Sequence, residues 1–409
     1  MDAIRIVLVG IGGYAENYVD VLLGPDPVGR LAGVAVVGVV DPYPEKCQKL
    51  SLIAARNIPI YPNLDTFYGA QTADLAVIST PIHLHVEQIL ACLAHGSHVL
   101  CEKPLCAVYQ DANRLLAAEK ASGKMVGIGF QLSYSNAVQE LKKDILAGSF
   151  GRAVQFKSVL LQPRGEQYYQ RNNWAGKLKT TQGHWVLDSP VSNACAHQLH
   201  NMLYLLGATR ETSAIPVELT AECYRAYPLI ENYDTAAIRC TTTAGTELLF
   251  YTSLAYQGAK KYGPYSEYRF EHAVVYHDHG NDENFWVRRD DGTIKNYGEL
   301  PKSDRLQKLW DALNAVRDGK PPACGIQAAL SHLLCANGAQ EAREIEPLPQ
   351  STIAVAGEPG NLTVYIPEIA EMFMDCYQQA KLPHEIGVPW SKPGRSIDLT
   401  HYERYPQFS

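Results

Sequence analysis

The stretch Ile4-Arg5-Ile6-Val7-Leu8-Val9-Gly10-Ile11-Gly12-Gly13-Tyr14-Ala15 opens the chain and decides its fold. Its aliphatic, β-branched first half predicts a buried strand, and the glycines that follow have the spacing G-x-G-x-x-A. In that pattern the first glycine allows a tight turn, and the second lets the backbone approach a pyrophosphate. A small third residue permits close packing of the next helix, whose N-terminus favours phosphate. The stretch therefore predicts a strand, a phosphate-binding turn and a helix.

A second apolar run, Val34-Ala35-Val36-Val37-Gly38-Val39-Val40, ends at Asp41. A carboxylate in this place accepts hydrogen bonds from a ribose diol and repels a ribose phosphate, which favours NAD over NADP. The separation from the glycines exceeds the usual ~20 residues, and we attribute the excess to an inserted loop at residues 24–29. The expected cofactor site is formed by Gly10, Gly12, Gly13, Tyr14, Ala15 and Asp41. The alternative is a glycine turn and a capping aspartate that bind no ligand.

Strands and helices continue to alternate up to about residue 130. Apolar runs predict further strands at 58–61, 75–80, 99–101 and 124–129, and helices are predicted at 44–56 and from Ile82 onward. This alternation is typical of an α/β, doubly wound parallel sheet, which binds its ligands at the carboxyl ends of the strands. We expect residues 1–130 to form a Rossmann domain that binds NAD.

The remainder of the chain is richer in half-buried strands. Alternating patterns predict strands at 154–159, 216–224, 234–243 and 246–252, and helices are predicted at 304–317 and 326–341. We expect residues 131–356 to form an α+β domain with a large, open, mainly antiparallel sheet that serves substrate binding and oligomerisation. Residues 357–409, with several prolines, are expected to be an ordered C-terminal extension packed on the rest.

Composition excludes several other classes of protein. The 409 residues are 46% hydrophobic and 19% charged, which fits a globular enzyme, and the net charge of −7 provides no basic surface for nucleic acid or an anionic membrane. No apolar run approaches the ~20 residues of a membrane span. Ten cysteines without a C-x-x-C pair, and a first strand that begins directly after Met1-Asp2-Ala3, indicate a reduced cytoplasmic protein.

Two further motifs follow predicted strands of the first domain. Thr80-Pro81, with His83 and His85, comes after one strand, and Cys101-Glu102-Lys103-Pro104-Leu105 comes after the next. A lysine at such a strand end would face a bound cofactor, although an exposed Glu-Lys pair of little energetic value is the alternative. Together with the glycine turn, these motifs resemble the Gfo/Idh/MocA family of oxidoreductases (glucose-fructose oxidoreductase, inositol dehydrogenase and rhizopine catabolism). The resemblance extends from Ile4 to about Ile345.

The resemblance implies that Lys103 lies beside the nicotinamide and the substrate hydroxyl. Its ammonium can stabilise an alkoxide or relay a proton as hydride leaves the carbon. We expect Glu102 to orient that ammonium and Pro104 to fix the turn. On this interpretation the cofactor site also includes Thr80, Pro81, His85, Glu102 and Lys103.

A second constellation of the family is D-x-G-x-H-x-x-D on a helix. The matching residues here are Asn193, Cys195, His197 and His200. His197 falls on the family's catalytic histidine and can take the hydroxyl proton, because imidazole titrates near neutral pH. Asn193 is predicted to lie on the same helix face and to hydrogen-bond a substrate hydroxyl. The missing aspartates remove charge partners of the histidine, and Asp188 is a candidate to compensate for them.

The histidines of this region also permit a zinc interpretation. His184, Cys195, His197 and His200 have metal-ligating side chains, but no remote ligand set has a typical zinc spacing. The family also implies no metal. We therefore expect no metal and predict that His184 is a packed or solvated side chain.

Residues 164–177 mix aromatic rings with arginine and asparagine. Such a mixture suits a polyhydroxylated ring, because aromatic faces cover C–H surfaces and polar groups bind hydroxyls. The alternative is an ordinary surface loop with a structural tryptophan. The expected substrate-binding residues are Arg164, Tyr169, Asn173, Trp174, Asp188 and His200.

The sequence therefore predicts an NAD-dependent oxidoreductase acting on a carbohydrate or cyclitol: a sugar, a sugar derivative or an inositol-like ring. Lys103, His197 and Asn193 are its expected catalytic residues. One alternative is a redox-neutral glycosidase or lyase that oxidises a ring carbon transiently, and another is a non-catalytic NAD-binding sensor or scaffold. A homodimer or homotetramer formed through the open sheet is expected by analogy with the family.

Overall fold

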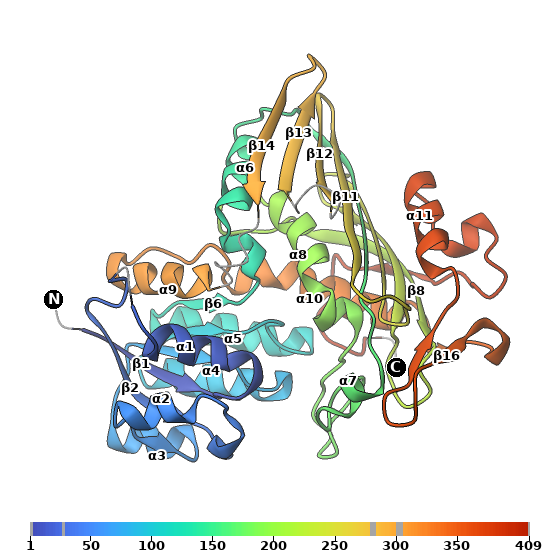
Figure 1. The fold of residues 1–409 in the computed structure, drawn as a ribbon. Coiled ribbons are helices and arrows are strands. Elements are labelled where there is room, and N and C mark those ends of the chain that lie inside the picture. Colours follow the sequence, from blue (N-terminus) through green and yellow to red (C-terminus); the bar gives the residue numbers. More distant parts are fainter. Residues whose placement is uncertain (1–2, 27–28, 279–283, 300–305, 408–409) are drawn as a thin grey trace. The chain divides into compact units, whose positions relative to one another are not determined.

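The computed structural model describes residues 3–26, 29–278, 284–299 and 306–407 (Figure 1). These residues form two compact units. The first unit lies within Met1–Cys106, Asp111–Tyr134 and Lys302–Gln327, and the second within Ala107–Gln110, Ser135–Pro301 and Ala328–Ser409. The chain thus returns to the first unit after most of the second unit. The expected domains were consecutive ranges, 1–130, 131–356 and 357–409, and such ranges do not describe this return.

A six-stranded parallel sheet forms the first unit. Its strands are β1 (Ile4–Val9), β2 (Val34–Val40), β3 (Ile60–Tyr61), β4 (Leu75–Ile78), β5 (His98–Cys101) and β6 (Val126–Ile128). They follow the order β3-β2-β1-β4-β5-β6, and every neighbouring pair is parallel. The order reverses between β1 and β4, which is the switch point where doubly wound sheets bind ligands. The predicted Rossmann fold is confirmed.

Helices surround this sheet. They include η1 (Gly13–Ala15), α1 (Glu16–Leu23), η2 (Pro44–Lys46), α2 (Leu50–Ala55), α3 (Leu64–Ala70), η3 (Ile82–Leu84), α4 (His85–Ala94), α5 (Tyr109–Ser122) and η4 (Gln131–Tyr134). The helix predicted at 44–56 is wrong in its extent, because the backbone at Cys47 is extended while its side chain is buried in the core. Pro27 and Val28 of the predicted inserted loop lie outside the described residues.

Helix α9 (Gln307–Asp318) completes the core of the first unit. Its apolar stripe, which includes Leu309 and Leu313, is buried in one cluster with Ile6, Leu8 and Leu22. Burial of these side chains accounts for the return of the chain, since an amphipathic helix must cover its apolar face. The predicted start of this helix at Asp304 lies outside the described residues.

A large mixed sheet forms the second unit. Its strands are β7 (Ala153–Leu161), β8 (Pro216–Arg225), β9 (Thr235–Thr242), β10 (Glu247–Ser253), β11 (Tyr262–Phe270), β12 (Ala273–Asp278), β13 (Asn284–Arg289), β14 (Ile294–Glu299), β15 (Glu346–Pro347) and β18 (Ser396–Asp398). The order is β14-β13-β12-β11-β7-β10-β9-β8-β15, and β18 also pairs with β8. Most pairs are antiparallel, as predicted, but β10 with β7 and β15 with β8 are parallel.

Helices pack on this sheet within the second unit. α6 (Asn136–Leu146) contacts β13 and β14, α8 (Ala196–Leu205) contacts β7, and α11 (Ile369–Gln379) contacts β7 and β10. The other elements are α7 (Glu166–Gln170), η5 (Pro190–Ala194), α10 (Ile326–Ala342), η8 (Gln350–Thr352), β16 (Ala354–Ala356), β17 (Thr363–Tyr365) and η9 (Pro383–Ile386). The helix predicted at 326–341 is confirmed by α10.

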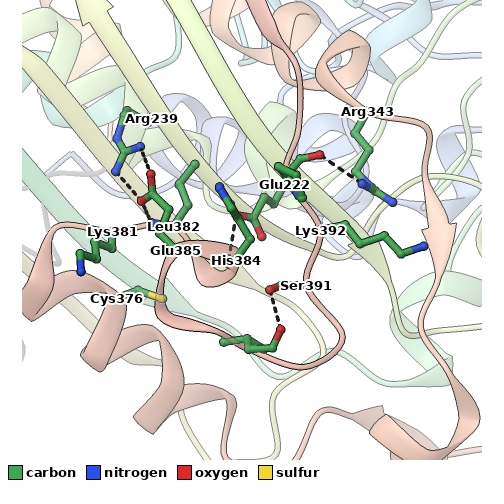
Figure 2. Close-up of polar contacts among 12 residues, drawn as sticks. Glu222, Arg239, Arg343, Cys376, Lys381, Leu382, His384, Glu385, Ser391 and Lys392 are labelled. Carbon is green, nitrogen blue, oxygen red and sulfur yellow. Dashed lines mark hydrogen bonds and ion pairs between the residues drawn. The ribbon is translucent and has the colours of Figure 1, made fainter.

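Polar contacts hold the C-terminal segment on strands β8 and β9 (Figure 2). Arg239 donates to both carboxylate oxygens of Glu385, at 2.6 and 2.7 Å. The carboxylate of Glu222 is fully buried and lies 2.6 Å from Nδ1 of His384. Phe373 and Cys376 of α11 add apolar burial to the same attachment. Residues 369–386 are therefore packed parts of the second unit.

Within residues 3–26, 29–278, 284–299 and 306–407, no helix is long and apolar enough to cross a membrane. All ten cysteine side chains are buried.

Candidate functional site

The glycine turn follows β1 at the switch point of the parallel sheet. Gly10 has φ +80°, and a Cβ at this position would lie 2.6 Å from the carbonyl oxygen of Ser79, so only glycine fits. Gly13 also has a positive φ, of +62°. A Cβ on Gly12 would meet no atom within 4 Å, so the space beside the second glycine is open to a ligand. Ala15 is buried, as its packing role requires.

The Asp41 carboxylate lies against this turn. Its Oδ2 accepts a hydrogen bond from the backbone N–H of Ile11 at 3.0 Å, and Oδ1 accepts from that of Tyr43 at 2.8 Å. The sequence thus placed this carboxylate beside the glycines correctly. Tyr14 is 38% exposed at the start of the following helix. An open glycine turn with an adjacent carboxylate fits the pyrophosphate and ribose of a dinucleotide.

His85 connects the two motifs that follow β4 and β5. Its Nε2 lies 2.9 Å from the carbonyl oxygen of Thr80, and its Nδ1 lies 2.8 Å from that of Pro104. The ring is buried, and this burial lowers its pKa. The expected cofactor contact of His85 is therefore wrong, because the ring is enclosed between two loops that it fixes. Thr80, whose hydroxyl donates to Gln88, and Pro81 are only partly buried.

Glu102 has different partners from those expected. Its Oε1 forms an ion pair with Lys308 of α9 and accepts from the hydroxyl of Tyr18 at 2.7 Å. The prediction that Glu102 orients the Lys103 ammonium is therefore wrong, because Lys308 and Tyr18 bind the Glu102 carboxylate. Lys103 itself is partly buried directly after β5. A Cβ on Gly129 would lie 2.7 Å from Glu102 Oε2, so the carboxylate also packs closely on backbone.

Lys308 is the residue that sequence reasoning missed. Its side chain is 1% exposed, and Nζ also donates to the hydroxyl of Tyr14 at 3.1 Å. Burial opposes its charge, but Glu102 and Tyr14 outweigh it and raise the pKa of Lys308. The sequence contained one signal for this ion pair, which is that Lys308 directly precedes the apolar stripe of α9. A lysine that is buried with such a stripe needs an acidic partner, because an unpaired lysine is almost never buried.

In the second unit, the segment that carries the candidate catalytic residues starts with a capped turn at Ser189. The Ser189 hydroxyl accepts from the N–H of Ser192 at 3.1 Å, and the next residues form a single π-helical turn, η5. Cys195, with φ −113° and ψ 13°, separates this turn from α8. Asn193 therefore does not lie on the helix of His197, and the expected shared helix face is wrong. His197 is partly exposed in the first turn of α8.

Asp188 reaches Asn193 from the preceding segment. Its Oδ1 accepts from Asn193 Nδ2 at 2.7 Å, and its Oδ2 accepts from the N–H of Gly176 at 2.7 Å. Gly176 has φ +69°, and a Cβ there would lie 2.5 Å from Ile230. A buried carboxylate thus joins the aromatic loop to the residue that replaces the family's first aspartate. The sequence analysis proposed Asp188 as a candidate to compensate for the missing aspartates but did not predict this contact.

Two expected substrate-binding residues lie inside the second unit. His200 has no exposed surface; its ring centroid lies 5.8 Å from that of Tyr204 and 6.3 Å from that of His332. Burial, followed by the charges of His332 and His197, lowers the pKa of His200. Tyr169 is buried in the core and lies 4.9 Å from the ring of Tyr227. The predicted substrate contacts of His200 and Tyr169 are wrong, because packing takes up both rings.

Other residues of the aromatic loop are accessible. Arg164 and Trp174 are partly buried, and Asn173 is exposed. The side-chain oxygen of Asn172 accepts from the N–H groups of Trp174 and Ala175, at 3.1 and 2.8 Å, which fixes the turn around the tryptophan. His184 is exposed. Among the residues that the structure describes, no group of three or more His, Cys, Asp or Glu side chains is arranged to hold a metal ion.

Comparison with known proteins agrees with this geometry. Residues 4–130 match the oxidoreductase family with an NAD-binding Rossmann fold, GFO_IDH_MocA. An inositol 2-dehydrogenase of Saccharopolyspora erythraea is 25% identical over 54% of this chain and 60% of its own length. A 2,7-anhydro-N-acetylneuraminate hydratase of Mediterraneibacter gnavus is 24% identical over 52% of this chain and 51% of its own length. The chain thus spans little more than half the length of these two relatives.

The fold extends the likeness beyond the first unit. The crystal structure of the WlbA dehydrogenase from Bordetella pertussis, in complex with NADH and UDP-GlcNAcA, superposes with a TM-score of 0.68. It covers 85% of this chain and 99% of that chain at 21% identity, so it shares the fold of both units. The glycine turn, Asp41 and the Glu-Lys-Pro motif lie within the matched Rossmann segment. Residues 4–130 thus match the NAD-binding Rossmann domain of the Gfo/Idh/MocA oxidoreductases, and the fold of both units is similar to that of the WlbA dehydrogenase.

Proposed function

We propose that this protein is an NAD-dependent oxidoreductase that transfers hydride between the nicotinamide and a hydroxyl-bearing carbon of a sugar, sugar derivative or cyclitol. The observation that carries the proposal is the Asp41 carboxylate, hydrogen-bonded to the N–H of Ile11 beside the open glycine turn. Its charge disfavours a ribose phosphate and so selects NAD. When bound, NAD supplies the hydride acceptor.

The relatives support this substrate class. One relative is named an inositol 2-dehydrogenase, and the WlbA structure contains NADH and UDP-GlcNAcA. A cyclitol and a nucleotide sugar both present secondary hydroxyls on a six-membered ring. The common reaction is therefore oxidation of a ring carbinol.

Two side chains are proposed to act on the reacting hydroxyl. His197 takes its proton, since a partly exposed imidazole at the start of a helix is accessible to substrate and can act as a general base. Lys103 stabilises the negative charge that develops on the oxygen. The two residues belong to different units, so each is assigned by its own surroundings.

Asn193 is proposed to position the substrate. One N–H of its side-chain amide is held by Asp188 at 2.7 Å. This hydrogen bond holds the amide in one orientation, and we propose that the amide binds a substrate hydroxyl. The arrangement keeps one carboxylate near the position where the family has its first aspartate, with the asparagine between it and the substrate.

A second candidate function is redox-neutral. The relative named 2,7-anhydro-N-acetylneuraminate hydratase favours it, since addition or removal of water needs no net oxidation. In this reaction, transient oxidation of a ring carbon acidifies the neighbouring C–H, a leaving group departs, and the hydride is returned. The residues proposed above would serve both reactions.

We also propose a cytoplasmic location and a homodimer or homotetramer. Ten buried cysteine thiols suit a reducing compartment. Strands β12 and β13 carry a partly exposed stacked pair, Tyr276 and Trp286, with ring centroids 4.4 Å apart. Such a surface suits a second copy of the chain.

The test combines two readouts on the purified protein. NADH absorbance is followed with NAD and a panel of sugars, sugar acids, glycosides and cyclitols, and products are identified by mass spectrometry. NADH formation would establish the dehydrogenase, whereas product without NADH would favour the redox-neutral reaction. Lys103→Ala should lower turnover about 100-fold or more without changing NAD affinity, and the exposed control Lys120→Ala should leave both unchanged. Full activity of Lys103→Ala would reject the assigned role.

A further inference from the structure

Two arginines of the aromatic loop stack on one tyrosine ring. The guanidinium carbon of Arg171 lies 3.6 Å from the ring centroid of Tyr168, and that of Arg164 lies 4.6 Å from it. Arg171 also lies 5.5 Å from the ring centroid of Trp174. A guanidinium held by its face keeps its N–H edges available for hydrogen bonds in its own plane. Stacking thus orders two cations without neutralising them.

Neither cation has an acidic partner in the described part of the chain. Arg164 donates to the side-chain oxygen of Gln162 at 2.8 Å and weakly to the carbonyl of Pro163, and Arg171 donates to the carbonyl of Tyr168 at 3.2 Å. The Nε atom of Arg164 is buried and has no hydrogen-bond partner. All these partners are neutral, so both positive charges remain for a bound anion.

Several other arginines of the second unit are neutralised instead. They form ion pairs with glutamates: Arg152 with Glu271, Arg239 with Glu247 and Glu385, Arg269 with Glu267, and Arg343 with Glu346. The two guanidinium groups on this ring repel each other, and an anion bound between them would relieve that repulsion. The pairing therefore points to an anionic ligand.

The arginine pair is linked to the proposed catalytic segment. Burial, and after it the charge of Asp188, raises the pKa of Tyr168. Asp188 in turn accepts from Asn193 and from the N–H of Gly176, each at 2.7 Å. The loop that carries the arginines is thus fastened to the residue proposed to position the substrate.

We propose that the substrate of this site carries an oxyanion, either a carboxylate or a phosphate, and that Arg164 and Arg171 bind it. The inference rests on the proposed function, because it names the substrate class of the same site. Two ordered guanidinium groups present parallel N–H donors that match the oxygens of either anion. An uncharged cyclitol would leave both cations unpaired.

Binding of matched probes to the full-length protein in the presence of NADH tests this inference. The probes are methyl β-D-glucuronide, which has a carboxylate, glucose 6-phosphate, and the uncharged methyl β-D-glucoside, and calorimetry measures their affinities. At least one anionic probe should bind about tenfold tighter than the glucoside, as expected for charge-assisted hydrogen bonds. The probe whose affinity exceeds that of the glucoside shows whether the site binds a carboxylate or a phosphate.

Variants assign the preference to the two arginines. The preference for the anionic probe over the glucoside should fall below about threefold in the Arg164→Gln/Arg171→Gln double variant. The NADH affinity of this variant should equal that of the wild type. Arg171→Lys, which keeps the charge but loses the planar stack, should give an intermediate value. Arg404→Gln removes an exposed positive charge of the same unit and should leave the preference unchanged.

Binding and turnover separate this inference from the proposed function. The inference is overturned if the anionic probes bind no better than the glucoside, including not at all, or if the double variant keeps the preference. Oxidation of an uncharged cyclitol at equal rates by wild type and double variant would retain the dehydrogenase and reject the oxyanion site. Loss of the preference in the double variant, with no NADH formed from any compound, would retain the oxyanion site and reject the dehydrogenase.

Discussion

The Glu102 carboxylate and the Lys308 ammonium form an ion pair inside the first unit, with side chains only 12% and 1% exposed. The pair joins the Glu-Lys-Pro motif to α9, although the two residues are far apart in the sequence. Tyr18 donates to the same carboxylate oxygen, and Tyr14 of the glycine turn contacts the ammonium. Two motifs of the cofactor domain are thus held together by a lysine from the last segment of the unit.

Removal of this lysine should destabilise the first unit strongly. Lys308→Met leaves a nearly buried carboxylate without its cation, which typically costs about 3–5 kcal/mol of the free energy of unfolding. The Glu102→Gln/Lys308→Met double variant removes both charges and should recover much of that loss. Urea unfolding followed by circular dichroism measures both. A cost below about 1 kcal/mol for Lys308→Met, as for exposed pairs, would contradict the proposed importance of the pair.

Asp41 should determine the choice between NADH and NADPH. Asp41→Asn keeps an oxygen acceptor for the N–H of Ile11 but removes the charge that repels a ribose phosphate. We expect it to lose less than about tenfold in NADH affinity and to gain NADPH binding. Asp41→Ala, which also removes the acceptor, should weaken the binding of both NADH and NADPH. Fluorescence titration gives the dissociation constants, and continued rejection of NADPH by Asp41→Asn would contradict the assigned role.

The hydrogen bond between Asp188 and Asn193 should affect turnover more than cofactor binding. Asp188→Asn can keep only one of the two acceptors that hold Gly176 and Asn193, so the Asn193 amide would lose its fixed orientation. We expect kcat to fall about tenfold or more, with NADH affinity unchanged. Asp188→Ala should add a loss of about 1–3 kcal/mol of stability, because a buried N–H remains unsatisfied. Unchanged kcat in Asp188→Asn would show that this contact does not position the substrate.

The sequence predicted what local patterns encode. The strand, glycine turn and Asp41 lie close together because parallel strands end at one edge, so a short motif implies their contact. The positions of β7 to β10 in the second unit followed from alternation, whereas β11 to β14 were not predicted. Parallel pairing of β10 with β7 did not follow from alternation, because the direction of a neighbouring strand depends on connections that periodicity does not contain.

The errors in the site have a common physical cause. His85, Tyr169 and His200 have the chemistry of binding residues, but their exposure depends on packing by distant segments. The shared helix face of Asn193 and His197 failed because a π-helical turn precedes α8, and hydrophobic spacing does not reveal such a turn. Lys308 was missed because its partner lies in another motif.

Asp234 gives a prediction for the dependence of stability on pH. Its buried carboxylate accepts from the N–H groups of Ala226 and Tyr227, at 3.0 and 2.7 Å, and from the Thr235 hydroxyl at 3.0 Å. Burial outweighs these hydrogen bonds and raises its pKa from 3.8 to about 6. Between these two values the unfolded chain has lost the proton and the folded chain retains it. The contribution of this group to stability is therefore full below about pH 4 and declines as the pH rises to about 6.

Asp234→Asn isolates this effect, because the amide does not titrate. The free energy of unfolding of the wild type minus that of the variant should fall by about 2 kcal/mol from pH 4 to pH 6.5, since each pKa unit corresponds to about 1.4 kcal/mol and this window covers most of the interval between the two pKa values. Above that range the difference should be constant. Urea unfolding at each pH gives these values, and a difference for Asp234→Asn that rises with pH would mean that the carboxylate is ionised and stabilising in the folded protein.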